Sequence, residues 1–312
     1  MTGTDISLSV IIPTYNRAHM VGHAIQSVLD QTYQDFEIVV VDDASKDNTE
    51  EVVKSFNDKR VRYIKHERNE GVAAARNTGI KATKSKYVAF QDSDDEWLPE
   101  KLEKQMVGFR TASSNIGVVY TAFLRIEGDK ETYIPSPEST PKEGDIYDSL
   151  VRGNFVATPA AVVKRECFAK AGMFDEGIPC LEDWELWLRI SKYYHFKCID
   201  QPLTIAYSGT PGSILANQGA LARGYELILK KHYGDIKEKG RKLLASYYIA
   251  AGNKLCLSGE FKRGRNYLIK AALAYPLNIA YLGAALASLL GQRGYNKAAV
   301  MHQTIRGRFP KT

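Results

Sequence analysis

Short apolar runs alternate with helix-like patterns over the first 120 or so residues, and this alternation limits the fold more than any other feature. The apolar runs predict four strands, at Leu8–Pro13, Glu37–Val41, Val61–Lys65 and Tyr87–Gln91. Between and after them lie helical patterns at about Ala18–Gln31, 50–56, Gly71–Ala82 and beyond Pro99. Such alternation is typical of an α/β protein with a mainly parallel sheet.

The second part of the chain is less regular and then becomes helical. Residues 128–145 contain three prolines and no helical period, so we expect a surface loop there. We expect two further strands, at Phe155–Val163 and Pro202–Tyr207, and a helix within Cys180–Tyr194. A Gly/Pro/Ser-rich stretch precedes an almost wholly helical pattern from Ile214. We therefore predict two domains, 1–212 and 213–312.

The charges divide unevenly between these two parts. The chain carries 42 Lys and Arg and 36 Asp and Glu, a net charge of +6. Residues 208–312 hold 17 of the basic residues and only 4 of the acidic ones, so residues 1–207 are net acidic. Such a split suggests different partners for the two parts, although a Lys-rich soluble helical region would show it as well. Aromatic and basic residues do not interleave on a strand, which argues against nucleic acid.

Several common classes of protein are excluded. The four cysteines are far apart and form no C-x-x-C, so neither a disulfide framework nor a zinc site is expected. No charged segment followed by a long apolar stretch marks a signal peptide, and we expect a reducing, cytoplasmic location. No P-loop or dinucleotide-binding glycine pattern is present, so a P-loop NTPase or a dehydrogenase is not expected.

Clustered carboxylates follow two of the expected strands. Asp42 and Asp43 lie at the end of the second expected strand, and Asp92, Asp94 and Asp95 follow the fourth expected strand. Ligands of open α/β sheets bind beyond the carboxyl ends of the strands. Burying several negatively charged carboxylates together is costly unless a cation compensates their charge. Because their ligand atoms are oxygens, the cation that they favour is Mg²⁺ or Mn²⁺. The alternative is that these aspartates only cap helices in surface turns.

Five segments in order along the chain resemble the family 2 glycosyltransferases. They are 9–17 (SVIIPTYNR), 41–45 (VDDAS), 69–77 (NEGVAAARN), 92–95 (DSDD) and 182–184 (EDW). The resemblance covers about residues 7–207. It implies a GT-A catalytic domain, Rossmann-like with a mainly parallel sheet, followed here by an all-helical C-terminal region. It also implies a nucleotide diphosphate sugar as donor.

The resemblance assigns roles to individual residues. It implies nucleotide contacts by Pro13, Thr14, Tyr15, Arg17, Asp42, Asp43, Arg76, Asp92 and Ser93. Asp94, the last acid of the DXD motif, corresponds to the ligand of a Mn²⁺ or Mg²⁺ cofactor, and Asp183 to the general base of the inverting enzymes. Asp95, Glu182 and Trp184 are candidates for acceptor or sugar contacts, whereas Trp187 is expected in the core. From the residues alone, Asp183 could equally be an acid at a helix start.

These roles together predict an inverting, metal-dependent transferase. It would move a sugar, from UDP in our first choice, to a hydroxyl of a saccharide or lipid-linked acceptor in polysaccharide synthesis. Ser208 and Thr210 stand where the family often has Arg and His. A catalytically silent nucleotide-binding scaffold is therefore the alternative. A nucleotidyltransferase would need a Gly-rich basic loop after the first strand, which is missing.

The helical region carries two further signals. Residues 248–276 match one tetratricopeptide-like unit, and a single unit indicates a helical hairpin rather than an array. The 22 residues between Lys270 and Arg293 carry no charge. They fit a buried helix, a membrane-interface helix or, less well because of Pro276, a spanning helix. The interface alternative predicts an anionic membrane as partner, which would place the protein peripherally at the inner face of the cell membrane.

Overall fold

The computed structural model describes residues 6–136, 141–209, 214–292 and 294–295. The chain forms two compact units. The first comprises Met1–Gly177 with Glu182–Pro211, and the second comprises Ile178–Leu181 with Gly212–Thr312. The predicted domain boundary at 212/213 lies outside the described residues.

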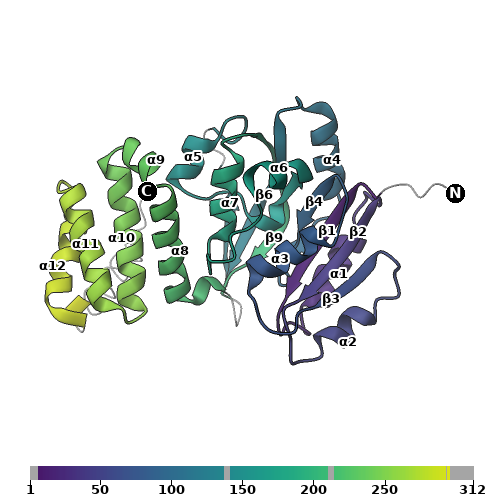
Figure 1. Cartoon of the computed structure of the whole chain (residues 1–312), viewed down its shortest axis with the longest axis horizontal. Helices are drawn as coiled ribbons and strands as arrows, with labels where there is room; N and C mark the ends of the chain where they lie inside the picture. Colours follow the sequence, from purple (N-terminus) through teal and green to yellow (C-terminus); the bar gives the residue numbers. More distant parts are fainter. Residues whose placement is uncertain (1–5, 137–140, 210–213, 293, 296–312) are drawn as a thin grey trace. The chain divides into compact units, whose positions relative to one another are not determined.

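A parallel sheet forms the start of the first unit. Strands β1 (Leu8–Thr14), β2 (Phe36–Asp42), β3 (Val61–Lys65) and β4 (Tyr87–Phe90) lie in the order β3-β2-β1-β4. The helices between them are α1 (Val21–Leu29), α2 (Thr49–Lys54) and α3 (Val72–Lys81). All four strands and the three helices therefore lie where the sequence pattern predicts them (Figure 1).

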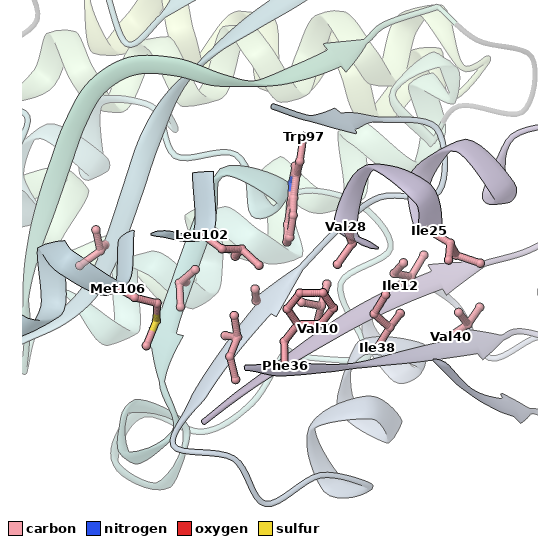
Figure 2. Close-up of a cluster of buried hydrophobic side chains, with 14 of the residues drawn as sticks. Val10, Ile12, Ile25, Val28, Phe36, Ile38, Val40, Trp97, Leu102 and Met106 are labelled. Atoms are coloured by element: carbon pink, nitrogen blue, oxygen red, sulfur yellow. The ribbon is translucent and has the colours of Figure 1, made fainter. Parts of the chain in front are cut away.

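Both faces of this sheet are covered by helices, which explains why its central strands read as continuous apolar runs. Val10 and Ile12 of β1 and Ile38 of β2 belong to a buried cluster with side chains of α1 and of α4 (Lys101–Thr111), shown in Figure 2. The side chain of Ile11 points to the opposite face of the sheet from Val10 and Ile12, and there it lies against Gly79 of α3. The strands are thereby fixed from both sides.

The sheet continues beyond β4 with mixed strand directions. Its further strands are β5 (Glu96–Trp97), β6 (Ile116–Glu127), β7 (Lys130–Ile134), β8 (Ala161–Lys164) and β9 (His195–Tyr207). The order runs β4-β8-β6-β9-β5, with β7 pairing to β6. Only β6 and β9 pair in parallel here, and the other four pairings are antiparallel. The α/β class is confirmed, with a mixed sheet in which β1–β4 pair only in parallel with one another and β6 and β9 form a further parallel pair.

Some expected elements differ from the structure. Residues 130–134 form β7 rather than loop, because Gly128 adopts a positive φ of 58° and turns the chain back along β6. Of the strand expected at Phe155–Val163 only the last three residues are strand, in β8 (Ala161–Lys164), because a 3₁₀ turn at Thr158–Ala160 precedes it and Pro159 cannot donate to a ladder. Residues 137–140 of the expected loop lie outside the described residues.

Three more helices complete the first unit. The helix expected within Cys180–Tyr194 is α7 (Glu182–Ile190). Two short helices, α5 (Tyr147–Arg152) and α6 (Arg165–Ala171), have no counterpart in the sequence-based prediction. With six and seven residues they are too short to show a helical period.

The second unit is helical in its described part, as predicted. It contains α8 (Gln218–Lys231), α9 (Tyr233–Glu238), α10 (Arg241–Leu257), α11 (Phe261–Ala274) and α12 (Ile279–Leu289). Helices α10 and α11 correspond to the expected hairpin and approach closely at two glycines. A Cβ on Gly264 would lie 2.8 Å from the carbonyl oxygen of Gly252, so larger residues would push the helices apart. Within the described part of the chain, no helix combines the length and apolarity needed to cross a bilayer.

The contact between α3 and β1 generates the first prediction. A Cβ added at Gly79 would lie 2.5 Å from Cγ2 of Ile11, a stiff β-branched side chain. We expect Gly79→Ala to lower stability by about 1–3 kcal/mol, because overpacking outweighs the better helix propensity of alanine. Thermal unfolding of the purified variant measures this change.

Gly22→Ala in α1 is the matched control for Gly79→Ala. A Cβ at Gly22 meets its nearest atom, Cγ1 of Val52, at an ordinary 3.5 Å. This variant should melt at or slightly above the wild-type temperature. Equal melting temperatures for the two variants would contradict the predicted close approach of α3 to β1.

Candidate active site at the carboxyl edge of the sheet

The predicted site residues gather where the strand order reverses. From β1 the chain first builds β2 and β3 on one side and then returns to place β4 on the other. The loops after β1, β2 and β4 therefore leave the same edge of the sheet from neighbouring strands. Ligands of open α/β sheets bind at such a reversal. These loops contain most of the residues that the sequence singled out.

The loop after β1 is fixed to the loop after β2. Asn16 has a φ of 52°, its N–H donates to Ser45 Oγ at 2.8 Å, and its side chain accepts from the Lys46 N–H. Pro13 and Thr14 still belong to β1. The Tyr15 side chain is 42% exposed. A rigid turn thus presents this aromatic ring to solvent.

Asp42 is buried at the end of β2, where the second loop begins. Its Oδ1 accepts from the Ser45 N–H at 2.8 Å and its Oδ2 from the Tyr63 hydroxyl at 2.5 Å. Burial and the neighbouring Asp42 carboxylate raise the pKa of Tyr63, which stays a hydrogen-bond donor. These bonds hold Asp42 in one orientation.

Asp43 fixes the segment that leads into α3. Its carboxylate accepts the N–H groups of Glu70 and Gly71, each at 2.8 Å, and contacts His66 Nδ1 at 2.8 Å. The other ring nitrogen of His66 lies 2.9 Å from Thr78 Oγ1. Asp43 therefore has a clear positioning role, and its contact with a nucleotide stays a prediction.

Arg76 joins two segments that are far apart in the sequence. This side chain of α3 is buried, with its Nη2 2.7 Å from Asp92 Oδ1 and its Nη1 hydrogen-bonded to Glu182. The guanidinium also lies over the Phe174 ring, 5.3 Å from its centroid. The loop after β4 and the start of α7 are thus held together by one cation.

The three carboxylates of the loop after β4 have different partners. Asp94 Oδ2 lies 3.5 Å from Nη2 of Arg17, and both side chains are largely covered. Asp95 is buried and accepts the Tyr207 N–H at 3.1 Å, which ties the loop to the end of β9. Burial, with the charges of Asp92 and Asp94, raises the pKa of Asp95 well above its usual range. Ser93 is buried beside them.

The carboxylate oxygens of this loop are the kind of ligand that hard divalent cations prefer. Such a cation would complete its coordination with water and with oxygens of the substrate. Asp92 and Asp94 offer carboxylate oxygens, and the side chain of Asp92 remains 30% exposed. Among the described residues, no three His, Cys, Asp or Glu side chains converge as a complete metal site. Mg²⁺ and Mn²⁺ commonly bind through one or two carboxylates plus phosphate oxygens, so Asp92 and Asp94 are the residues of this loop that could hold such an ion, and the metal stays a prediction.

Asp183 lies in the first turn of α7, next to the Glu182 that Arg76 binds. Its Oδ1 accepts from the Trp184 N–H at 2.6 Å and its Oδ2 from Asn154 Nδ2 at 3.1 Å. Burial and the Glu182 carboxylate raise the pKa of Asp183 to about 7, although Arg76 and these hydrogen bonds act in the opposite direction. A carboxylate with this pKa can accept a proton near neutral pH.

The two tryptophans of α7 serve packing. Trp187 is fully buried and donates to the Val156 carbonyl at 2.9 Å, in line with the core position expected for it. Trp184 is also buried and donates to the Leu150 carbonyl at 2.7 Å. This position favours packing against α5 over the predicted sugar contact of Trp184.

Some residues of the site were not anticipated from the sequence. Asn154 and His66 hold Asp183 and Asp43, but each stands in a segment without a recognisable local motif.

Ser208 donates its N–H to the Ile126 carbonyl at 2.8 Å and so extends the sheet. Thr210, the second departure from the family pattern, lies outside the described residues.

Comparisons with known proteins agree with this geometry. A family model described as glycosyl transferase family 2 matches residues 9–169. An uncharacterized glycosyltransferase of Rickettsia bellii is 37% identical over 188 residues, or 60% of this chain and 26% of the relative. This chain thus spans only about a quarter of that relative.

A second relative is matched along nearly its whole length. The UDP-Glc:alpha-D-GlcNAc-diphosphoundecaprenol beta-1,3-glucosyltransferase WfgD of Escherichia coli is 33% identical over 263 residues, which cover 76% of this chain and 99% of WfgD. The crystal structure of S. aureus TarS 1-349 with UDP-GlcNAc matches with a TM-score of 0.70 at 20% identity, covering 96% of this chain and 92% of TarS 1-349. The GT-A fold followed by C-terminal helices is thereby confirmed, and the chain belongs to glycosyl transferase family 2.

Proposed function

We propose that this protein is an inverting glycosyltransferase that uses a UDP-sugar and a divalent cation. It would transfer the sugar to a hydroxyl of a saccharide or lipid-linked acceptor during synthesis of a cell-surface polysaccharide. The observation that carries the proposal is the Arg76 bridge, which joins Asp92 of the loop after β4 to Glu182, the residue next to the base candidate Asp183 in the sequence.

The choice of donor and acceptor class draws on the relatives. The name of WfgD gives UDP-Glc as its donor and a diphosphoundecaprenol-linked sugar as its acceptor. TarS binds UDP-GlcNAc in its crystal structure. Both donors are UDP-sugars, which supports uridine as the nucleoside here. In this proposal the exposed Tyr15 ring and the buried Thr14 Oγ1, which has no partner among the described residues, face the nucleotide.

The chemistry requires a proton acceptor for the acceptor hydroxyl. Asp183 would accept this proton as the hydroxyl oxygen attacks the anomeric carbon, and attack opposite the departing nucleotide would invert the configuration. Asn154 donates a hydrogen bond to Oδ2 of Asp183. This bond restricts rotation of the carboxylate, so that its free lone pairs would keep one orientation toward the acceptor hydroxyl. A cation on Asp94 and Asp92 would neutralise the charge that develops on the departing diphosphate.

Replacing the base candidate tests the proposed mechanism. Asp183→Asn keeps the shape of the side chain but cannot accept a proton. We expect sugar transfer to fall by about 10²–10⁴-fold, the usual contribution of a general base, while UDP binding changes little. Transfer is measured as UDP release with an acceptor, and binding by calorimetry.

The matched control is Asp129→Asn, the same substitution in the exposed turn between β6 and β7. It should leave transfer and UDP binding at wild-type levels. If Asp183→Asn turned over donor as fast as the wild type, Asp183 would not be the base. Intact UDP binding without transfer by the wild type to any acceptor tested would favour the silent scaffold.

The raised pKa of Asp183 predicts a pH dependence of the reaction. Below about pH 7 the carboxylate is protonated and cannot act as a base, so kcat/KM should fall about tenfold per pH unit under this point. Asn154 donates to Asp183 and favours its charged form. Asn154→Ala should therefore move the inflection to higher pH. A wild-type inflection near pH 4 would contradict this environment of Asp183.

The metal assignment has a separate test. Thermal stabilisation of the wild type by UDP should be larger with Mn²⁺ than without it, because the cation links Asp94 to the diphosphate. Asp94→Asn should lose this Mn²⁺-dependent part, whereas Asp129→Asn should retain it. The same shift with and without Mn²⁺ in the wild type would argue against a metal-assisted donor site.

A further inference from the structure

Helix α12 has an unusual distribution of side chains for a helix of a water-soluble unit. Its buried positions hold small residues, Ala285 and Ser288. Its large side chains are exposed instead: Leu286 is 64%, Leu289 60% and Ile279 84% exposed. Helices on a protein surface normally turn their large apolar residues to the core. Packing against the described residues of the unit therefore does not explain the leucines of α12.

These exposed residues form one continuous surface. Ile279, Leu282, Leu286, Leu289 and Leu290 are spaced by one to four residues and line one side of the helix. We call them the apolar stripe. Leu277, 83% exposed, lies just before α12 and continues the exposed apolar sequence. Contiguous apolar patches of this kind mark interaction sites.

The surrounding charge indicates which partner fits the stripe. The described residues after Glu260 include no aspartate or glutamate and four basic residues, Lys262, Arg263, Arg265 and Lys270, of which Arg263 forms ion pairs with Glu226 and Glu260. Lys262 and Lys270 are exposed on α11, the helix that packs against α12. Within α12 itself there is no charged residue. The chemistry is that of an apolar surface beside a helix with net positive charge.

An anionic lipid surface matches both properties. Helices that lie in a membrane interface bury an apolar face at the boundary of headgroups and acyl chains, and nearby lysines and arginines attract anionic lipids. At 11 residues α12 is about 16 Å long, too short to span the bilayer. A second copy of this chain fits less well, because two basic surfaces would repel each other.

We propose that α12 docks the second unit onto an anionic membrane surface through the apolar stripe. The stripe would enter the headgroup region with the helix parallel to the membrane plane, and the basic residues of α11 would remain near the headgroups. This proposal does not depend on the transferase activity. It gives a role to the part of the chain that the proposed reaction does not use.

Vesicle binding by the full-length protein tests the proposal. We expect it to sediment with vesicles of equimolar phosphatidylcholine and phosphatidylglycerol at low salt. Binding to phosphatidylcholine alone, or at high salt, should be much weaker because the electrostatic attraction is lost. The variant Leu282→Gln/Leu286→Gln/Leu289→Gln should bind the anionic vesicles about tenfold or more weakly, since three apolar groups no longer enter the interface.

The matched control replaces three exposed apolar residues of the same unit that lie outside the stripe: Ile214→Gln/Leu215→Gln/Leu257→Gln. It should bind vesicles like the wild type. Circular dichroism and UDP binding of both variants establish that each remains folded.

Four outcomes would overturn the proposal. They are no vesicle binding by the wild type, equal binding to neutral and anionic vesicles, equal losses in both triple variants, and self-association of the wild type that the stripe variant abolishes without any vesicle binding. The last result would assign the stripe to a contact between copies of this chain.

Discussion

The buried guanidinium of Arg76 is the interaction on which the site depends. A buried cation is costly unless carboxylates compensate it, and here Asp92 and Glu182 do so by binding its two terminal nitrogens. Without the guanidinium, the two carboxylates would face each other in a poorly solvated space. Arg76 therefore links the loop after β4 directly to the start of α7, where the base candidate Asp183 follows Glu182.

The parallel part of the sheet gives this bridge a rigid support. Helices cover both faces of β1 and β2, so the strands cannot slide without opening the core on either side. Asn16 and Ser45 join the first two loops, and the backbone N–H of Tyr207 binds Asp95 in the third. The three loops are thus fixed to the sheet and to each other, since Arg17 of the first also pairs with Asp94 of the third. Loops held in this way suit the proposed transfer, in which charge would develop on a leaving group.

Much of the catalytic unit was predictable because its information is local. The first four strands, the helices between them and the carboxylates at the strand ends follow from patterns of a few neighbouring residues. Strand β7 and helices α5 and α6 were missed because they are short or are decided by pairing with distant segments. Trp184 was expected near the sugar, yet its indole is buried against the Leu150 carbonyl. Only packing distinguishes these two uses of a tryptophan on a helix.

The sequence by itself determined the α/β class, the family, and the residues that gather at the carboxyl edge of the sheet, since strand periodicity and motif order are written along the chain. The tertiary structure decided which of these residues meet. Arg76 and Glu182 are 106 positions apart, and no local pattern relates them. It also decided that the uncharged segment after Lys270 forms a helix with exposed leucines, because which face of a helix is buried depends on its neighbours. Burial and pairing across long separations come from the folded chain alone.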